Sequence, residues 1–212
     1  MDAIRIDEND SDYPKILRHR LGRDAPPCLY AMGEPSILRH RLLGLICSIQ
    51  CPGSIVIQTF DATRALRDAG VVVVGGFHSP MEQECLDILL RGQQPVILCA
   101  AKGLAGLRIG RQARRAVQEG RLLALSPFAK SVRRTTAAQA VQRNSLVAAL
   151  AHAAWAPYAA PGGKTETLCR KIIAIRQSLF TVDAPENANL LALGAKSPVV
   201  EELSVLGEGT AG

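Results

Sequence analysis

The stretch Val71-Val72-Val73-Val74-Gly75-Gly76-Phe77-His78-Ser79-Pro80 decides the class of fold. Four consecutive β-branched residues predict a buried strand, and the two glycines that follow predict its end. Ser79 suits a helix N-cap and Pro80 suits the first helical turn, so a helix is expected over residues 80–91. A fully apolar strand followed at once by a helix is typical of a parallel sheet that is covered on both faces.

The same strand–helix unit recurs on both sides of this stretch. Apolar runs of strand length occupy residues 43–48, 71–74, 95–100, 122–125, 151–158 and 179–182. Helices are expected over residues 54–68, 80–91, 108–119, 137–149, 164–174 and 188–193. This alternation predicts an α/β protein with a Rossmann-like, doubly wound, mostly parallel sheet and helices on both faces.

The length of 212 residues suits one domain with small additions. We expect an acidic leader with a short helical and extended segment over residues 1–41, of which residues 1–12 are loosely ordered. A Rossmann-like domain is expected over residues 42–196 and a flexible tail over residues 197–212. No apolar run approaches the roughly 20 residues that span a bilayer, and the acidic N-terminus does not resemble a signal peptide. A cytoplasmic protein with no membrane association is therefore expected.

The six cysteines are scattered along the chain, and no two of them form a C-x-x-C pair. Without a secretion signal they are interpreted as reduced and mostly buried thiols. Paired metal-ligand spacings are missing, so we expect no metal site and no cofactor.

Basic residues are concentrated in one segment of the chain. The 25 Lys and Arg residues exceed the 19 Asp and Glu residues, which gives a net charge of +6. Residues 108–143 hold nine basic residues and one acidic residue, a net charge of +8 that leaves −2 for the rest of the chain. Such a patch fits a polyanionic partner, although a solvated helix face with a basic loop would give the same count. Its predicted members are Arg108, Arg111, Arg115, Arg133 and Arg134.

Ligands of doubly wound sheets bind beyond the carboxyl ends of the strands, so the turns at that edge are the candidate site. Glycines there let a ligand approach the backbone, and free N–H groups at a helix start attract phosphate. The candidate turn residues are Ser48, Gly53 and Ser54 after the first strand, Gly75, Gly76, His78 and Ser79 after the second, and Gly162, Gly163, Lys164 and Thr165 after the fifth. Arg143 and Asn144 are added as polar residues in an otherwise apolar helix, where a solvated stripe with Gln139 and Gln142 is the other interpretation.

The order of these motifs resembles the DNA-processing protein A (DprA/Smf) family over roughly residues 12–196. The resemblance rests on short motifs that occur in the order the family has them. They are Tyr13-Pro14, Leu29-Tyr30 with Gly33, Val73-Val74-Gly75-Gly76, Glu119-Gly120-Arg121-Leu122-Leu123 with Ser126-Pro127-Phe128, Arg143-Asn144, the turn with Thr165, and Asn189-Leu190-Leu191 with Gly194-Ala195. It implies an extended Rossmann-like core, single-stranded DNA held in a basic pocket, a homodimer and a RecA-type recombinase as partner.

The sequence departs from the family pattern at several of these positions. The first turn reads Cys47-Ser48-Ile49 where the family has Gly-Ser-Arg, and the Arg-Asn-Arg motif is reduced to Arg143-Asn144-Ser145. We expect no C-terminal winged-helix domain after this core. A divergent member of the family is therefore predicted.

A second resemblance leads to a different hypothesis. The turn Pro161-Gly162-Gly163-Lys164-Thr165-Glu166 is similar to the Pro-Gly-Gly-x-Gly-Thr turn of the LOG, or lysine decarboxylase-like, nucleotide phosphoribohydrolases of the same superfamily, with one glycine missing. A nucleotide-binding sensor or such a hydrolase is thus the alternative to a DNA-binding protein. Glu166 or Glu82 would be its acid/base and Arg143 its phosphate partner, whereas no catalytic residue is expected for the DNA-binding hypothesis.

Overall fold

The computed structural model describes residues 3–197, and its centre is one eight-stranded sheet. The strand order is β1-β2-β6-β5-β4-β3-β7-β8. All neighbours from β6 to β8 along this order are parallel, whereas β1 and β2 pair antiparallel with each other and β2 pairs antiparallel with β6. The parallel strands are β3 (Leu42–Leu45), β4 (Val72–Gly75), β5 (Val96–Cys99), β6 (Leu122–Ser126), β7 (Ala153–Trp155) and β8 (Ser178–Phe180). The predicted α/β fold with a doubly wound, mostly parallel sheet is confirmed.

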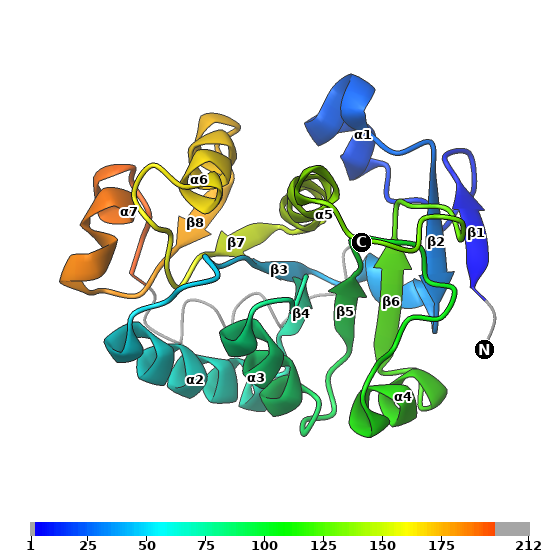
Figure 1. Ribbon diagram of the computed structural model, residues 1–212, viewed down its shortest axis with the longest axis horizontal. Coiled ribbons are helices and arrows are strands. Elements are labelled where there is room, and N and C mark those ends of the chain that lie inside the picture. The colour runs from blue at the N-terminus through cyan, green and yellow to red at the C-terminus, as the bar shows by residue number, and fades with distance from the viewer. Residues whose placement is uncertain (1–2, 198–212) are drawn as a thin grey trace.

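Helices cover both faces of the sheet (Figure 1). One face carries α2 (Gly53–Asp68), α3 (Pro80–Leu89) and α4 (Arg111–Gln118), and the other carries α1 (Ile16–Leu21), α5 (Ala137–Leu150) and α6 (Lys164–Ala174). The short α7 (Ala188–Ala192) follows β8, and three 3-10 turns lie at Gly22–Asp24, Pro35–Arg39 and Pro185–Asn187. Two large apolar clusters, one under each helix layer, form the core.

The strands between the two helix layers are apolar on both sides because both sides are buried. Every residue of β3, β4 and β6 is buried. Gly44 in β3 permits the close packing of α5, since a Cβ at this position would lie 2.9 Å from the Cβ of Ala151. The sequence pattern therefore reports burial correctly, and it also marks where a helix approaches the backbone.

Strands β3 and β7 end at Leu45 and Trp155, well before the predicted ends at residues 48 and 158. Residues 46–48 and 156–158 lie outside the regular strands. Backbone hydrogen bonds nevertheless still join the segment after β3 to the end of β7 and the segment after it. Ile46 N–H donates to Trp155 O at 3.1 Å and Ser48 N–H donates to Tyr158 O at 3.1 Å. Apolar residues thus continue beyond the strand because the loops at this edge are themselves packed.

The expectation of a loosely ordered leader over residues 1–12 is wrong for the segment that forms β1 (Ile4–Asp7). This strand pairs antiparallel with β2 (Cys28–Met32) and extends the sheet. Only Ile6 of β1 is buried, so a four-residue edge strand between acidic residues gives no apolar pattern to detect. The division into residues 1–41 and 42–196 stays a prediction, and nearly all of the predicted tail, residues 198–212, lies outside the described residues.

Candidate functional site

The strand order reverses between β3 and β7, which places the crevice of this sheet at the loops that follow these two strands. Ser48, a predicted site residue, joins the two loops. Its N–H donates to Tyr158 O at 3.1 Å, and its Oγ accepts the N–H of Ala160 at 3.0 Å. The Ser48 hydroxyl therefore ties the β7 loop to the β3 loop.

The start of α2, where Gly53 and Ser54 were predicted to meet phosphate, is faced by a carboxylate of the chain. Ser54 Oγ donates to Glu186 Oε1 at 2.7 Å, and this bond holds the pKa of the Glu186 carboxyl below its ordinary value. No atom lies within 4 Å of the position that a Cβ of Gly53 would occupy, so there is free space beside this residue. The hydroxyl at this helix start already has an anionic partner.

The second predicted turn is also closed by a glutamate. Glu82 Oε2 accepts the N–H of Ser79 at 2.9 Å and the N–H of His78 at 3.2 Å, while Ser79 Oγ accepts the N–H of Glu82 at 3.2 Å. Glu82 and Ser79 are both buried. This reciprocal capping box satisfies the N–H groups that would otherwise bind phosphate at the start of α3.

In the third predicted turn, too, a glutamate of the following helix accepts an N–H group of the turn. The N–H of Gly162 donates to Glu166 Oε2, and Arg170 Nη2 lies 2.8 Å from Glu166 Oε1. These two donors, the Gly162 N–H first, hold the pKa of the Glu166 carboxyl below its ordinary value. Gly163 is the N-cap of α6, Thr165 is buried, and Lys164 is exposed. Of this turn, Lys164 is the member that presents a charged side chain to solvent.

Arg143 does not belong to a solvated stripe. Its side chain is buried beneath the second turn, with 5% of the residue exposed, and Asn144 is half-buried. Nη1 lies 3.4 Å from Cys99 O, while Nε has no hydrogen-bond partner among the described residues. Burial lowers the pKa of the guanidinium, and the nearby Glu82 charge opposes that shift. Arg143 thus connects the ends of β4 and β5 from inside the protein.

The exposed positive charge at this edge lies instead on two long loops, which we call the two-loop surface. The first loop joins β5 to α4 (residues 100–110) and the second joins β6 to α5 (residues 127–136). They are fixed to each other and to β6, because Gly103 N–H donates to Val132 O at 2.8 Å and Ser126 Oγ donates to Lys102 O at 2.7 Å. The cations of these loops are the half-buried Lys102 and the exposed Arg108, Lys130, Arg133 and Arg134.

The predicted basic patch divides into two parts in the structure. Within residues 3–197, no carboxylate forms an ion pair with Arg108, Arg111, Arg133 or Arg134. Arg115, in contrast, lies 2.6 Å from Glu119 Oε1, and Arg121 lies 2.6 Å from Glu119 Oε2 at the far end of α4. Including Arg115 in the patch is wrong because a count of charges along the sequence does not consider its i, i+4 ion pair with Glu119.

Two hollows border the first loop and share Ala105 and Gly106 in their lining. One, of about 480 Å³, is lined by Arg5, Tyr30, Met32, Leu104 and Lys130 among others, and the other, of about 400 Å³, is lined by Lys102, Ala105, Gly106 and Arg133. Sequence reasoning missed Lys102, Arg5 and Tyr30. Lys102 lies just beyond Ala100 and Ala101 at the end of β5, a signal that could have been used, whereas Arg5 and Tyr30 come from strands that join the sheet antiparallel.

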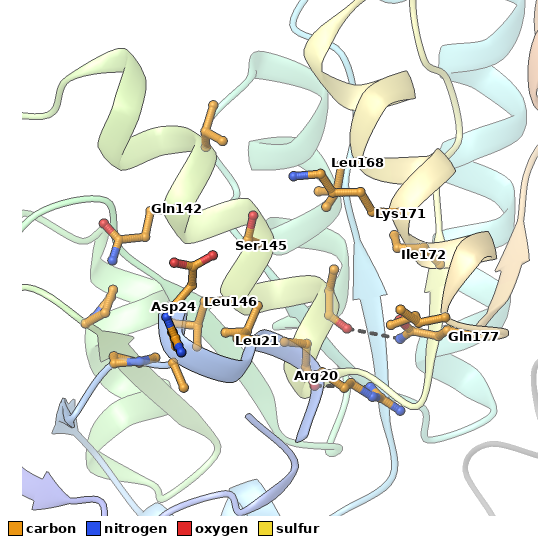
Figure 2. Close-up of a pocket in the computed structure, with 18 of the residues that line it drawn as sticks. Arg20, Leu21, Asp24, Gln142, Ser145, Leu146, Leu168, Lys171, Ile172 and Gln177 are labelled. Atoms are coloured by element: carbon orange, nitrogen blue, oxygen red, sulfur yellow. Dashed lines mark hydrogen bonds between the residues drawn. The ribbon is translucent and has the colours of Figure 1, made fainter. Parts of the chain in front are cut away.

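A larger cavity, of about 660 Å³, lies between α1, α5 and α6 (Figure 2). Its labelled lining residues include Arg20, Gln142, Lys171 and Gln177. Gln177 Nε2 donates to Ala148 O at 3.0 Å, and Arg20 Nη1 donates to Ala149 O at 3.1 Å. These side chains satisfy the last carbonyls of α5, and none of the predicted site residues lines this cavity.

Comparison with known proteins identifies the family. The model of the DNA recombination-mediator protein A family matches residues 5–196. The chain belongs to this family. The fold agrees, since a DNA processing protein A from Streptococcus pneumoniae superposes with a TM-score of 0.78 at 16% identity, covering 97% of this chain and 74% of that one. A DNA processing protein A from Helicobacter pylori, described for its single-stranded DNA binding mode, superposes with a TM-score of 0.76 at 19% identity, covering 96% and 94%.

Among curated proteins, none matches this chain significantly. Family membership confirms the predicted resemblance and assigns the chain a DprA-like role in DNA processing. Residues 3–197 contain no helix long and apolar enough to cross a membrane. The described part of this family member also shows no group of three or more His, Cys, Asp or Glu side chains placed to hold a metal ion.

Proposed function

We propose that the two-loop surface binds single-stranded DNA. The observation that carries this proposal is the set of cations on two loops that are fixed to each other at the carboxyl edge of the sheet. Cations that lack a carboxylate partner can neutralise phosphates without first breaking an ion pair. Binding of this kind releases counterions, so the affinity falls steeply as the salt concentration rises.

The hollows beside the segment 104–106 supply room for bases. Tyr30 and Met32 line the larger one together with Lys130, which places an aromatic ring beside a cation. Stacking of a base on an aromatic side chain contributes about 1–3 kcal/mol and tolerates any sequence. We therefore expect the bound DNA strand to run from Lys102 and Arg133 across Gly106 to Tyr30.

The glycine-rich turns have a secondary role in this proposal. Each turn has a glutamate that accepts one or more of its donors: Glu82 accepts the N–H of Ser79, Glu166 the N–H of Gly162, and Glu186 the hydroxyl of Ser54. Phosphate would have to displace these carboxylates from Ser54, Ser79 and Gly162. Ser48 is bonded to Ala160 and Gly76 lies against Arg143, so these residues too contribute mainly by shaping the edge. Lys164 adds an exposed cation to it.

The alternative of a nucleotide hydrolase or sensor has less support. Glu166, its candidate acid/base, is bound by the Gly162 N–H and by Arg170 and is held in the charged form. Arg143, the candidate phosphate partner, is covered by Gly76. A homodimer and a RecA-type recombinase partner are part of our proposal on the family resemblance alone, and a cytoplasmic location stays an expectation from the sequence.

The proposal is tested by the fluorescence anisotropy of a labelled oligo-dT at two salt concentrations, with AMP and ADP-ribose as competitors. We expect saturable binding that weakens as salt rises and that neither nucleotide displaces. Binding of the nucleotides without binding of the oligonucleotide would contradict the proposal and support the nucleotide hypothesis.

A further inference from the structure

The cavity between α1, α5 and α6 is a groove with an apolar floor. Leu146 of α5 and Leu168 and Ile172 of α6 line it. Val141 and Ile175 line it as well, and these two large apolar residues are 44% and 51% exposed. A groove that leaves large apolar side chains in contact with water is typical of an interaction surface.

One wall of the groove carries a buried acceptor that lacks a donor. Gln177 is 7% exposed, and its Nε2 donates to Ala148 O at 3.0 Å and to Ala151 O at 2.6 Å. These two carbonyls fix the orientation of the amide, because only its NH2 group can face them. Oε1 then has no hydrogen-bond partner among residues 3–197. Since Gln177 lines the cavity (Figure 2), a ligand with an N–H group would satisfy this oxygen.

The charged side chains of the groove are mostly cations. Arg20, Arg23 and Lys171 line it, and Asp24 is the carboxylate found with them in the described lining. Neither Arg23 nor Lys171 forms an ion pair within the part of the chain that the structure describes. The groove therefore suits a ligand that is apolar, carries N–H groups and is negatively charged. An acidic, apolar peptide has this chemistry.

We propose that this groove binds residues 199–206 of the same chain. The segment reads Val199-Val200-Glu201-Glu202-Leu203-Ser204-Val205-Leu206, which is five large apolar residues with two adjacent carboxylates and no cation. Its apolar side chains would cover the floor of the groove, its carboxylates would pair with the free cations, and a backbone N–H would reach Gln177 Oε1. This surface differs from the one proposed for DNA, and the inference does not rest on DNA binding.

The path of the chain brings this segment within reach of the groove. Lys196 N–H donates to Leu179 O at 2.8 Å, and Leu179 lies in β8, which begins directly after Gln177. Ser197, the last described residue, therefore follows a residue that is bonded to the strand leading out of the cavity wall. Two residues of extended chain span about 7 Å. Only a few residues beyond Ser197 are thus needed to return to Gln177.

Zero-length crosslinking of carboxylates to lysines in the full chain tests the proposal. A carbodiimide joins a carboxylate to a lysine only where the two are in contact, and peptide mapping by mass spectrometry locates the new amide bond. We expect a bond from Glu201 or Glu202 to Lys171. Lys171→Arg should abolish it, because arginine keeps the positive charge but does not form this amide. Lys164→Arg is the matched control that should retain the bond, since Lys164 is another exposed lysine of α6 and does not line the cavity.

A mixture of 15N-labelled and unlabelled chains shows whether the bond lies within one chain. We expect both crosslinked peptides to carry the same label. A product of mixed label would overturn docking within one chain and assign the groove to this segment of a second copy. Absence of the bond to Lys171, or bonds to Lys164 as frequent as those to Lys171, would overturn the proposal and leave the groove open to another protein.

The double substitution Leu203→Ser with Leu206→Ser tests the apolar part of the contact without changing the charge. These positions lie outside the described fold, so residues 3–197 keep their packing. We expect most of the crosslink to Lys171 to be lost, although both carboxylates remain. A yield equal to that of the wild type would show that charge alone brings the carboxylates to Lys171, and it would overturn docking in the groove.

Discussion

The guanidinium of Arg143 occupies the space that a side chain at position 76 would need. A Cβ on Gly76 would lie 1.9 Å from Arg143 Nη1 and 2.1 Å from Arg143 Cζ. The sequence motif of two glycines after β4 therefore has a packing reason: Gly76 lets a buried cation from α5 reach the end of the strand. Gly76 and Arg143, both predicted site residues, are thus brought together, but Arg143 is buried in the protein and does not face solvent.

We expect Gly76→Ala to destabilise the fold, because Arg143 is buried and cannot move aside cheaply. Overpacking of this kind costs about 1–3 kcal/mol of the free energy of unfolding, and urea denaturation measures it. Gly53→Ala is the control, since no atom lies within 4 Å of its Cβ position and it begins α2. A glycine at such a site gains stability or stays neutral when replaced by alanine. Equal stability of the two variants would contradict the packing argument.

We expect Glu166→Gln to destabilise the protein in a pH-dependent way. Because the Gly162 N–H and Arg170 lower the pKa of this carboxyl in the fold, its ionised form contributes stability above the ordinary value of 4.5. That contribution is lost as the pH falls through the lowered pKa. The difference in the free energy of unfolding between wild type and variant should thus be present at neutral pH and narrow in acid.

Denaturation curves at a series of pH values measure this difference. Glu84→Gln serves as the control, because Glu84 is exposed on α3 and forms no ion pair with the described residues. A stability gap for Glu166→Gln that is the same at every pH would show that the charge of Glu166 is not its cause.

We expect Arg20→Ala to loosen the N-terminal helix from α5. Arg20 Nη1 donates to the carbonyl oxygens of Ala149 and Ala151 at the end of α5, and a hydrogen bond from a charged group contributes about 1.5–3 kcal/mol. Arg23→Ala is the matched control, since Arg23 lines the same cavity without a hydrogen bond to the described residues. Urea denaturation compares the two, and a loss for Arg23→Ala as large as that for Arg20→Ala would contradict the capping role.

The parallel part of the fold could be predicted because burial on both faces makes its strands uniformly apolar. Val72–Gly75 and Leu122–Ser126 show this directly, since every residue in them is buried. The edge strand Ile4–Asp7 could not be predicted, because its side chains are mostly exposed and its pairing depends on β2. Local patterns report burial, whereas an exposed edge strand is fixed by a distant partner.

The candidate site was predictable only in outline. The sequence indicates which turns lie at the carboxyl edge, because each of them follows the end of a strand that is predicted to be parallel. It does not show that Glu82 and Glu166 return to cap their own turns, although the spacing of Ser79 and Glu82 fits a capping box. It also does not show that Arg143 is buried while Lys102 and Arg133 line an open hollow. Those facts depend on tertiary packing.

The central claim is that the two-loop surface binds single-stranded DNA, and the salt dependence of oligo-dT binding by matched double variants tests it most directly. Lys102→Ala with Arg133→Ala removes two cations of this surface. Arg64→Ala with Arg115→Ala removes two exposed cations that are paired with Asp61 and Glu119. The net charge changes equally in both.

We expect the Lys102/Arg133 variant to bind at least about tenfold more weakly at low salt. The slope of log Kd against log salt should become smaller by about 0.7 for each lost phosphate contact. The Arg64/Arg115 variant should keep nearly the wild-type affinity and slope. Equal losses in the two variants, or an unchanged slope for Lys102/Arg133, would contradict the proposed interface.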